Sequence, residues 1–280
     1  TPPVWIEDLQ VYPQDVKLRP ARLTIRGRIG NATAKSGQGK LWLHADYAAL
    51  NSSAAVDRTV EVSWAAEGGA FETELGFSKD VRLWDEFDPV TYHLGAFLSP
   101  TDSEPGEPGK PVRPDREVTF GLRGFSTDGT QFTINGRKTF IRGTLECCIF
   151  PKTGYPPTEV AEWKRVIGVA KAHGLNNLRF HSWCPPEAAF VAADELGMYL
   201  HVEVSSWANS DSSLGDGRPV DQWLYEETDR ILKAYGNHPS FMLMPYGNEP
   251  GGKNHAAFLA KWVEYCKAKD PRRLYTSGAG

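Results

Sequence analysis

The hydrophobic pattern of the chain changes its period near residue 137, and this change constrains the fold more than any other feature. Before it, short runs alternate apolar and polar residues, as strands with one buried face do. These runs lie at residues 22–29, 40–47, 59–64, 71–77 and 91–97. Because Gly, Asn and Ser separate them, we expect an antiparallel β-sandwich of about seven strands over residues 1–120.

Two stretches follow the last of these runs. Residues 99–117 are rich in Pro, Gly and charge, and they predict a long solvated loop rather than an ordered element. Residues 121–137 carry two hairpin turn signals, Asp128-Gly129 and Asn135-Gly136, which supply positive φ angles in tight turns. This second stretch therefore predicts a β-ribbon that connects the sandwich to the rest of the chain.

The remaining residues, 138–280, alternate predicted strands with amphipathic helices. The strands are expected to start at residues 138, 176, 198, 240 and 274. This spacing fits an eight-unit TIM (β/α) barrel, which has about 31 residues per unit. A doubly wound parallel sheet is the alternative, but its Gly-rich phosphate turn is absent after the first predicted strand. We therefore expect the N-terminal half of a TIM barrel, truncated at Gly280.

Composition argues against several classes of partner and cofactor. The net charge is −4 and the sequence has no basic run, so we expect neither nucleic acid nor a membrane surface as partner. No apolar stretch approaches the roughly 18 residues of a membrane span. The cysteines form no CxxC pair, so a zinc ribbon is disfavoured, and we expect no metal and no cofactor. Adjacent Cys147 and Cys148 fit two half-buried thiols better than a strained disulfide, and a soft-metal site that includes Cys184 is a minor alternative.

Polar and aromatic side chains are predicted at the carboxyl ends of successive strands, where barrels form their active sites. Carboxylates, an arginine, a histidine and indole faces together describe a pocket that suits a sugar. The candidates are Glu146, Arg179, His181, Trp183, Glu203, Trp207, Asn248 and Glu249.

Glu249 is the strongest candidate for a catalytic residue. A glycosidase needs one carboxylic acid that protonates the leaving oxygen, and a second carboxylate on the other face of the anomeric carbon. Burial favours the protonated form of such an acid, and the apolar run that ends in Gly-Asn-Glu-Pro is expected to bury Glu249. Asn248 is placed to hold a ring hydroxyl. The alternative for Glu249 is a carboxylate that caps the following helix.

The other candidates also have structural interpretations. Arg179 is either a partner for a nucleophilic carboxylate or half of a structural ion pair. His181 either binds a sugar hydroxyl or satisfies a loop. Trp183 and Trp207 either stack on a sugar ring or close the rim of the barrel. The same two interpretations, substrate contact and structure, apply to Glu203 and Glu146.

Several motifs resemble glycoside hydrolase family 2, which includes β-galactosidases, β-glucuronidases and β-mannosidases. They are RKTFIRGT, LNNLRFHSWCPP, AADELGMYLHVEV, YGNHPSFMLMPYGNEPGG and DPRRLYTSG, and LWDEFDPVTYHL resembles the family signature near the end of an immunoglobulin-like domain. The resemblance implies an immunoglobulin-like sandwich before the barrel, and a retaining mechanism with Glu249 as general acid/base. It also implies that Asn248 binds the 2-hydroxyl, and it matches Arg179 to the family's arginine of the second strand and Glu203 to the carboxylate that closes the third.

The chain also differs from the family pattern. The family carries its nucleophilic Glu at the end of the seventh barrel strand, about 90 residues beyond Glu249, so we expect the nucleophile past Gly280. The family's N-terminal jelly-roll domain is likewise expected outside this chain. The family has His where this chain has Ser182, with His181 one place earlier, so its sugar preference does not transfer.

The expected function is therefore that of a retaining exo-β-glycosidase acting on terminal β-linked sugars, with β-galactosidase as the first candidate. The alternative is a non-catalytic carbohydrate-binding module with a vestigial half site. The expected partners are a carbohydrate substrate and either a second copy or the rest of the barrel, because half a barrel leaves one parallel edge uncovered. The start, TPPVWIEDLQ, has no features of a signal peptide, yet a periplasmic or secreted location is expected rather than a cytoplasmic one.

Overall fold

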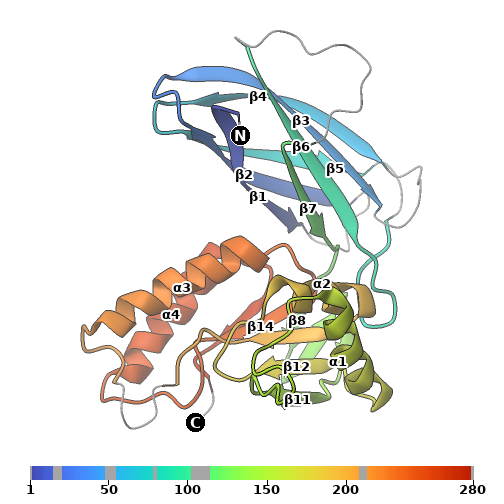
Figure 1. The fold of residues 1–280 in the computed structure, drawn as a ribbon, viewed down its shortest axis with the longest axis vertical. Helices are drawn as coiled ribbons and strands as arrows, with labels where there is room; N and C mark the ends of the chain where they lie inside the picture. Colours follow the sequence, from blue (N-terminus) through green and yellow to red (C-terminus); the bar gives the residue numbers. More distant parts are fainter. Residues whose placement is uncertain are drawn as a thin grey trace. The chain divides into compact units, whose positions relative to one another are not determined.

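The chain forms two compact units in the computed structural model, which describes residues 2–14, 21–47, 55–77, 81–101, 114–207 and 213–278. The first unit comprises Thr1–Arg82 and Thr91–Leu122, and the second comprises Leu83–Val90 and Arg123–Gly280 (Figure 1). Among the described residues, no helix combines the length and the apolar character that crossing a membrane requires.

The first unit contains two antiparallel sheets, with the orders β1-β2-β5 and β4-β3-β6-β7. Its strands are β1 (Val4–Pro13), β2 (Arg22–Asn31), β3 (Gly37–Tyr47), β4 (Val56–Trp64), β5 (Gly69–Gly76), β6 (Tyr92–Pro100) and β7 (Arg116–Phe120). Burial alternates along the strands, as in β3, where Leu41, Leu43 and Ala45 are buried and the residues between them are not. The prediction of antiparallel strands in this part of the chain is confirmed.

The predicted loop over residues 99–117 is wrong at both of its ends. β6 continues to Pro100, which pairs with Gly39 of β3, and β7 begins at Arg116, which pairs with Ala96 of β6. Backbone hydrogen bonding to these neighbouring strands overrides the loop-like composition. Residues 102–113 of the predicted loop lie outside the described residues.

A three-stranded antiparallel ribbon opens the main part of the second unit. It consists of β8 (Phe125–Asp128), β9 (Gln131–Ile134) and β10 (Arg137–Thr139), in the order β10-β9-β8. Both predicted turns have the expected positive φ angles: 59° at Gly129, and 53° and 78° at Asn135 and Gly136.

The strand predicted to begin the parallel sheet at residue 138 is misplaced. Residues 137–139 pair with β9 and belong to the ribbon. The first parallel strand is β11 (Gly143–Glu146), which pairs with β12 (Asn177–Phe180). An apolar run between two turn signals fits a strand of the ribbon as well as a strand of the parallel sheet. The observed pairing with β9 assigns these residues to the ribbon.

The rest of the second unit is a parallel sheet with the strand order β11-β12-β13-β14-β15 and helices between the strands. The other strands are β13 (Tyr199–Val202), β14 (Phe241–Pro245) and β15 (Leu274–Thr276), and the helices are α1 (Val160–Ala172), α2 (Glu187–Leu196), α3 (Pro219–Tyr235) and α4 (His255–Lys269). A doubly wound sheet reverses its strand order at a switch point. The strictly sequential order of this sheet has no such reversal.

The helices bury their apolar faces against this sheet. The fully buried side chains include Trp163 of α1, Phe190 of α2 and Trp262 of α4. Figure 1 shows α3 and α4 side by side, and Tyr265 and Lys269 of α4 both contact Asp229 of α3. Because the strands of this sheet are parallel, their carboxyl ends lie at one edge of the sheet.

The segment Leu83–Val90 groups with the second unit, although it lies inside the range predicted for the sandwich. The indole of Trp84 donates to the Asp194 carbonyl oxygen at 2.8 Å, and Asn176 donates to the Glu86 carboxylate at 3.0 Å. Gly197, at the end of α2, has a φ of 70°, and a Cβ there would lie 2.8 Å from the Glu86 carbonyl oxygen. The first residues of the signature motif LWDEFDPVTYHL thus pack against the end of α2.

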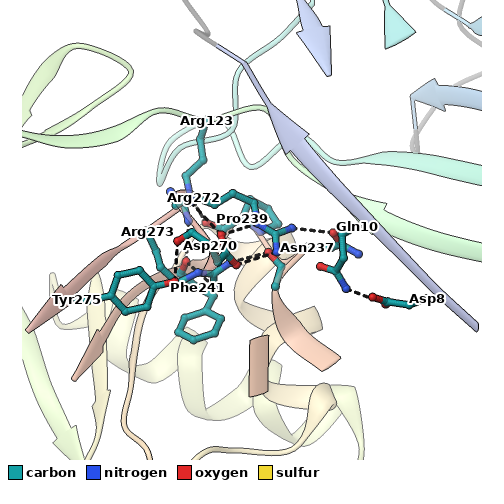
Figure 2. Close-up of polar contacts among 11 residues, drawn as sticks. Asp8, Gln10, Arg123, Asn237, Pro239, Phe241, Asp270, Arg272, Arg273 and Tyr275 are labelled. Carbon is teal, nitrogen blue, oxygen red and sulfur yellow. Dashed lines mark hydrogen bonds and ion pairs between the residues drawn. The ribbon is translucent and has the colours of Figure 1, made fainter. Parts of the chain in front are cut away.

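A cluster of charged side chains joins the amino-terminal ends of β14 and β15 (Figure 2). Arg123 donates to the carbonyl oxygens of Pro239 and Phe241, at 2.5 and 2.6 Å. Asp270 accepts hydrogen bonds from Arg272 and Arg273, at 2.8 and 3.1 Å. Burial, followed by the positive charge of Arg273, lowers the pKa of Arg123 to about 9.

The Asp270 carboxylate is expected to make the protein sensitive to acid. Burial alone would raise the pKa of Asp270, but the charges of Arg273 and Arg272 outweigh it and hold this pKa well below its usual range. Such a group stabilises the fold above its unfolded pKa of about 3.9, and this stability is lost as the pH falls through the folded value. We therefore expect the wild type to lose more stability between pH 7 and pH 3 than Asp270→Asn does.

Urea unfolding midpoints at the two pH values measure this difference. Asp229→Asn, which removes an exposed partner of Lys269, serves as the control and should follow the wild type. An equal acid response in the wild type and in Asp270→Asn would refute the expectation.

Candidate active site

Three of the predicted residues meet at the carboxyl ends of neighbouring strands. Arg179 lies in β12, Glu203 directly follows β13, and Asn248 follows β14. The Nε of Arg179 donates to Oε1 of Glu203 at 2.6 Å, and its Nη2 donates to Oδ1 of Asn248 at 2.8 Å. One guanidinium therefore connects the ends of three strands.

Glu203 is fully buried, and both of its carboxylate oxygens have donors. Oε1 accepts from Arg179, and Oε2 accepts from the backbone N–H of Ser182 at 2.6 Å. Ser182 has a φ of 60°, a left-handed conformation in the turn that follows β12. The charge of Glu203 is thus compensated and its orientation is fixed, which matches the structural ion-pair interpretation of Arg179.

A glycine brings the segments after β13 and β14 together. Gly247 has a φ of 152°, and a Cβ at this position would lie 2.0 Å from the Ser206 carbonyl oxygen. That same oxygen accepts the backbone N–H of Asn248 at 2.9 Å, and Trp207 and Asn248 form a parallel bridge. Only a residue without a side chain allows this approach, which sets the position of Asn248 and Glu249.

Glu249 is exposed, so the predicted burial of this residue is wrong. Asn248 takes the buried position at the end of the strand, and Glu249 follows it with a left-handed φ of 43°. Oε2 of Glu249 accepts a hydrogen bond from the indole Nε1 of Trp207 at 2.5 Å. Glu249 does not cap α4, because the N-cap position of that helix is Asn254.

His181 and Trp207 lie against each other beside Glu249. Their rings meet edge to face, with centroids 4.9 Å apart and an interplanar angle of 77°. The imidazole and the indole thus form one wall next to the candidate acid. His181 also donates its backbone N–H to the Glu146 carbonyl oxygen at 2.9 Å, which attaches this wall to the end of β11.

Trp183 packs into the protein. Its indole N–H donates to the Glu146 carbonyl oxygen at 3.1 Å, and its ring lies edge-on to Phe180, with centroids 5.3 Å apart. It also contacts Trp163 of the core. These contacts favour the interpretation that Trp183 closes the rim.

Glu146 is a second carboxyl group at this edge of the sheet. Burial raises the pKa of Glu146, although the backbone N–H of Cys148 donates to its Oε2 at 3.0 Å and opposes the shift. Glu146 therefore keeps its proton to a higher pH than an ordinary glutamate does.

The cysteines near this edge are free thiols. Cys147 and Cys148 are exposed, which corrects the prediction that they are half-buried, and Cys184 is half-buried. Burial raises the pKa of the Cys184 thiol. In the part of the chain that the structure describes, no group of His, Cys, Asp or Glu side chains is arranged to hold a metal ion, so the soft-metal alternative finds no support.

His201 belongs to the same region, but it was not among the residues predicted from the sequence. It pairs in register with Arg179 on the neighbouring strand. Burial, followed by the positive charge of Arg179, lowers the pKa of His201 to about 4. Its buried Nε2 has no hydrogen-bond partner among the described residues. The signal that could have found it is its place two residues before Glu203, on the same face of the strand.

Comparisons with known proteins extend over the whole chain, although no family model matches it. A β-galactosidase of Oenococcus oeni is 26% identical over 292 residues, which cover 99% of this chain and 27% of that protein. A glycosyl hydrolase family 2 member from Bacteroides cellulosilyticus superposes with a TM-score of 0.78 at 18% identity, over 100% of this chain and 37% of that one. A β-glucuronidase of Parabacteroides merdae gives a TM-score of 0.75 at 18% identity, over 98% of this chain and 33% of that one.

The chain therefore spans 27% of the length of the curated relative, and 37% and 33% of the two solved structures. The motif-based prediction is consistent with both comparisons: the curated relative is a β-galactosidase, and a glycosyl hydrolase family 2 member shares the fold. The resemblance of this chain to glycoside hydrolase family 2 is confirmed along its whole length.

Proposed function

We propose that the protein to which these residues belong is a retaining β-glycosidase, with Glu249 as its general acid/base. The observation that carries the proposal is the pair of hydrogen bonds that the guanidinium of Arg179 donates to buried Glu203 and Asn248. These residues lie at the carboxyl ends of adjacent strands, and Asn248 directly precedes Glu249. Barrel enzymes use this edge of the sheet for catalysis. The curated relative is a β-galactosidase, which supports the same class of reaction.

The proposal includes the fold. The first unit is interpreted as an immunoglobulin-like sandwich, because its sheets of three and four antiparallel strands have the composition of that fold. The second unit is interpreted as the first five strands of a (β/α)8 barrel, because its parallel strands follow one another in sequential order. The predicted ranges 1–120, 121–137 and 138–280 are proposed as domains with two changes: Leu83–Val90 is grouped with the second unit, and the ribbon extends to Thr139.

The arrangement of Asn248 assigns a role to its amide. A guanidinium is a hydrogen-bond donor only, so the atom of Asn248 that faces Arg179 is the oxygen Oδ1. The Nδ2 group is then left to donate, and the described residues offer it no acceptor. We assign this N–H₂ to a sugar hydroxyl, with the 2-hydroxyl as the choice that the family resemblance implies.

The proposed reaction has two steps. Glu249 first protonates the leaving glycosidic oxygen while a second carboxylate attacks the anomeric carbon. Glu249 then removes a proton from the water that hydrolyses the glycosyl-enzyme. Glu203 is unsuited to the nucleophilic role, because both of its oxygens already accept hydrogen bonds, one from Arg179 and one from the backbone N–H of Ser182. We place the nucleophile at the end of the seventh barrel strand, past Gly280.

β-Galactosides are the first candidate substrates, and β-glucuronides are the second. The first choice follows the curated relative and the second follows the solved β-glucuronidase. The rival proposal is a carbohydrate-binding module without hydrolytic activity. The exposure of Glu249 favours this rival, because the burial expected of a general acid at this position is absent.

A panel of aryl β-glycosides tests the proposal. We expect the full-length protein to hydrolyse at least one of them, and the isolated 280-residue chain to hydrolyse none, because a retaining enzyme needs two carboxyl groups about 5 Å apart. NMR of the first-formed sugar should show the β anomer, as retention requires. Turnover by the isolated chain would refute the missing nucleophile, and sugar binding without turnover by the full-length protein would favour the module.

A further inference from the structure

The indole of Trp207 is in direct contact with the candidate acid. Its Nε1 donates to Oε2 of Glu249 at 2.5 Å. An indole N–H can only donate a hydrogen bond. The oxygen Oε2 must therefore act as the acceptor both when Glu249 is ionised and when it is protonated. The carbonyl oxygen of a carboxylic acid is a better acceptor than its hydroxyl oxygen, so this contact favours the protonated form that carries its proton on Oε1.

We propose that Trp207 is a positioning residue, which keeps the transferable proton of Glu249 on Oε1 and turns that oxygen toward the substrate. This inference rests on the proposed function of Glu249 as the general acid. It gives Trp207 a role other than the two predicted from the sequence, stacking on a sugar and closing the rim.

The backbone around Trp207 holds the donor in place. Trp207 and Asn248 form a parallel bridge, and the N–H of Asn248 donates to the Ser206 carbonyl oxygen at 2.9 Å. The residue directly before the donor Trp207 is therefore hydrogen-bonded to the residue directly before the acceptor Glu249. The ring of His181 lies edge-on to the indole, at 4.9 Å between centroids, and limits its rotation.

Because Trp207 is largely exposed, its proposed positioning role can be tested separately from its packing. The residue is 54% exposed, so its ring contributes little to the hydrophobic core. Removing only the N–H group should therefore leave the fold intact. The hydrogen bond also acts after proton transfer, because a donor beside a carboxylate stabilises its ionised form. Without Trp207 the acid should occupy more than one orientation.

Trp207→Phe tests the inference in the full-length protein, since it keeps an aromatic ring against His181 and removes the donor. We expect kcat for alkyl β-glycosides to fall about tenfold or more, the loss typical of a hydrogen bond to a charged group. KM should change little, and activated aryl glycosides should lose less in the glycosylation step.

Trp42→Phe is the matched control. Trp42 is 40% exposed, and its indole donates to the Asp57 carboxylate at 3.0 Å, but it lies in β3 of the first unit. This variant should leave kcat and the pH profile unchanged. Thermal unfolding of both variants verifies that each one folds.

The outcomes distinguish this inference from the function on which it rests. Equal losses on alkyl and aryl substrates would overturn the role of Trp207. If Glu249→Gln behaves as the loss of a general acid while Trp207→Phe matches the wild type, the inference fails and the proposed function stands. If Glu249→Gln retains full activity on alkyl glycosides, the proposed function fails as well.

Discussion

Replacing Glu249 by Gln is expected to lower kcat/KM for alkyl β-glycosides by about 10²- to 10⁴-fold, the range that general acid–base catalysis contributes. Gln has nearly the same shape and can still accept the indole N–H of Trp207 through its carbonyl oxygen. It cannot give a proton to the leaving oxygen. Steady-state kinetics of the full-length protein on alkyl and activated aryl glycosides therefore isolate the proton transfer.

The leaving group provides the internal control for this prediction. An activated aryl leaving group departs with little protonation, so its glycosylation step should lose much less than that of an alkyl glycoside. Glu264→Gln, on the exposed face of α4, should leave both rates unchanged. Equal losses on the two substrate classes in Glu249→Gln would count against the acid role.

The positions of most elements could be predicted from the sequence, because the spacing of apolar residues indicates which face of a helix or strand is buried. Apolar stripes and terminal glycines predicted α1 and α2, and Gly197 indeed has the left-handed φ of a helix end. The run near residue 138 was different. Its pattern fits a ribbon strand as well as a parallel strand, and only the pairing of Arg137–Thr139 with β9 decides between them.

The sequence predicted which residues belong to the candidate site, but not how these residues contact one another. Strand ends predicted that Arg179, Glu203 and Asn248 lie near one another, since neighbouring parallel strands end at one edge. Their hydrogen bonds depend on side-chain orientation, which periodicity does not encode. Glu249 is exposed and has a left-handed φ of 43°. That conformation is uncommon for a residue other than glycine, so no pattern in the sequence indicated it.

The ion pair between partly buried Arg179 and fully buried Glu203 leads to the second large effect. Removing one partner of a buried ion pair leaves the other charge uncompensated, which typically destabilises a protein by about 3–5 kcal/mol. The Glu203 side chain has no exposed surface, and after Arg179→Met the N–H of Ser182 would be its one remaining donor among the described residues. We therefore expect Arg179→Met to lose about 3–5 kcal/mol of unfolding free energy, measured by urea denaturation of the full-length protein at pH 7.

Two further variants determine whether the lost stability arises from the buried charge. The double variant Arg179→Met/Glu203→Gln removes both charges, so it should be more stable than Arg179→Met alone. Arg165→Met breaks an exposed pair with Glu162 on α1 and should lose only about 0–1 kcal/mol. If Arg179→Met loses no more than Arg165→Met, the guanidinium does not hold Glu203 in place. Asn248 would then lack the fixed orientation on which its proposed contact with the sugar depends.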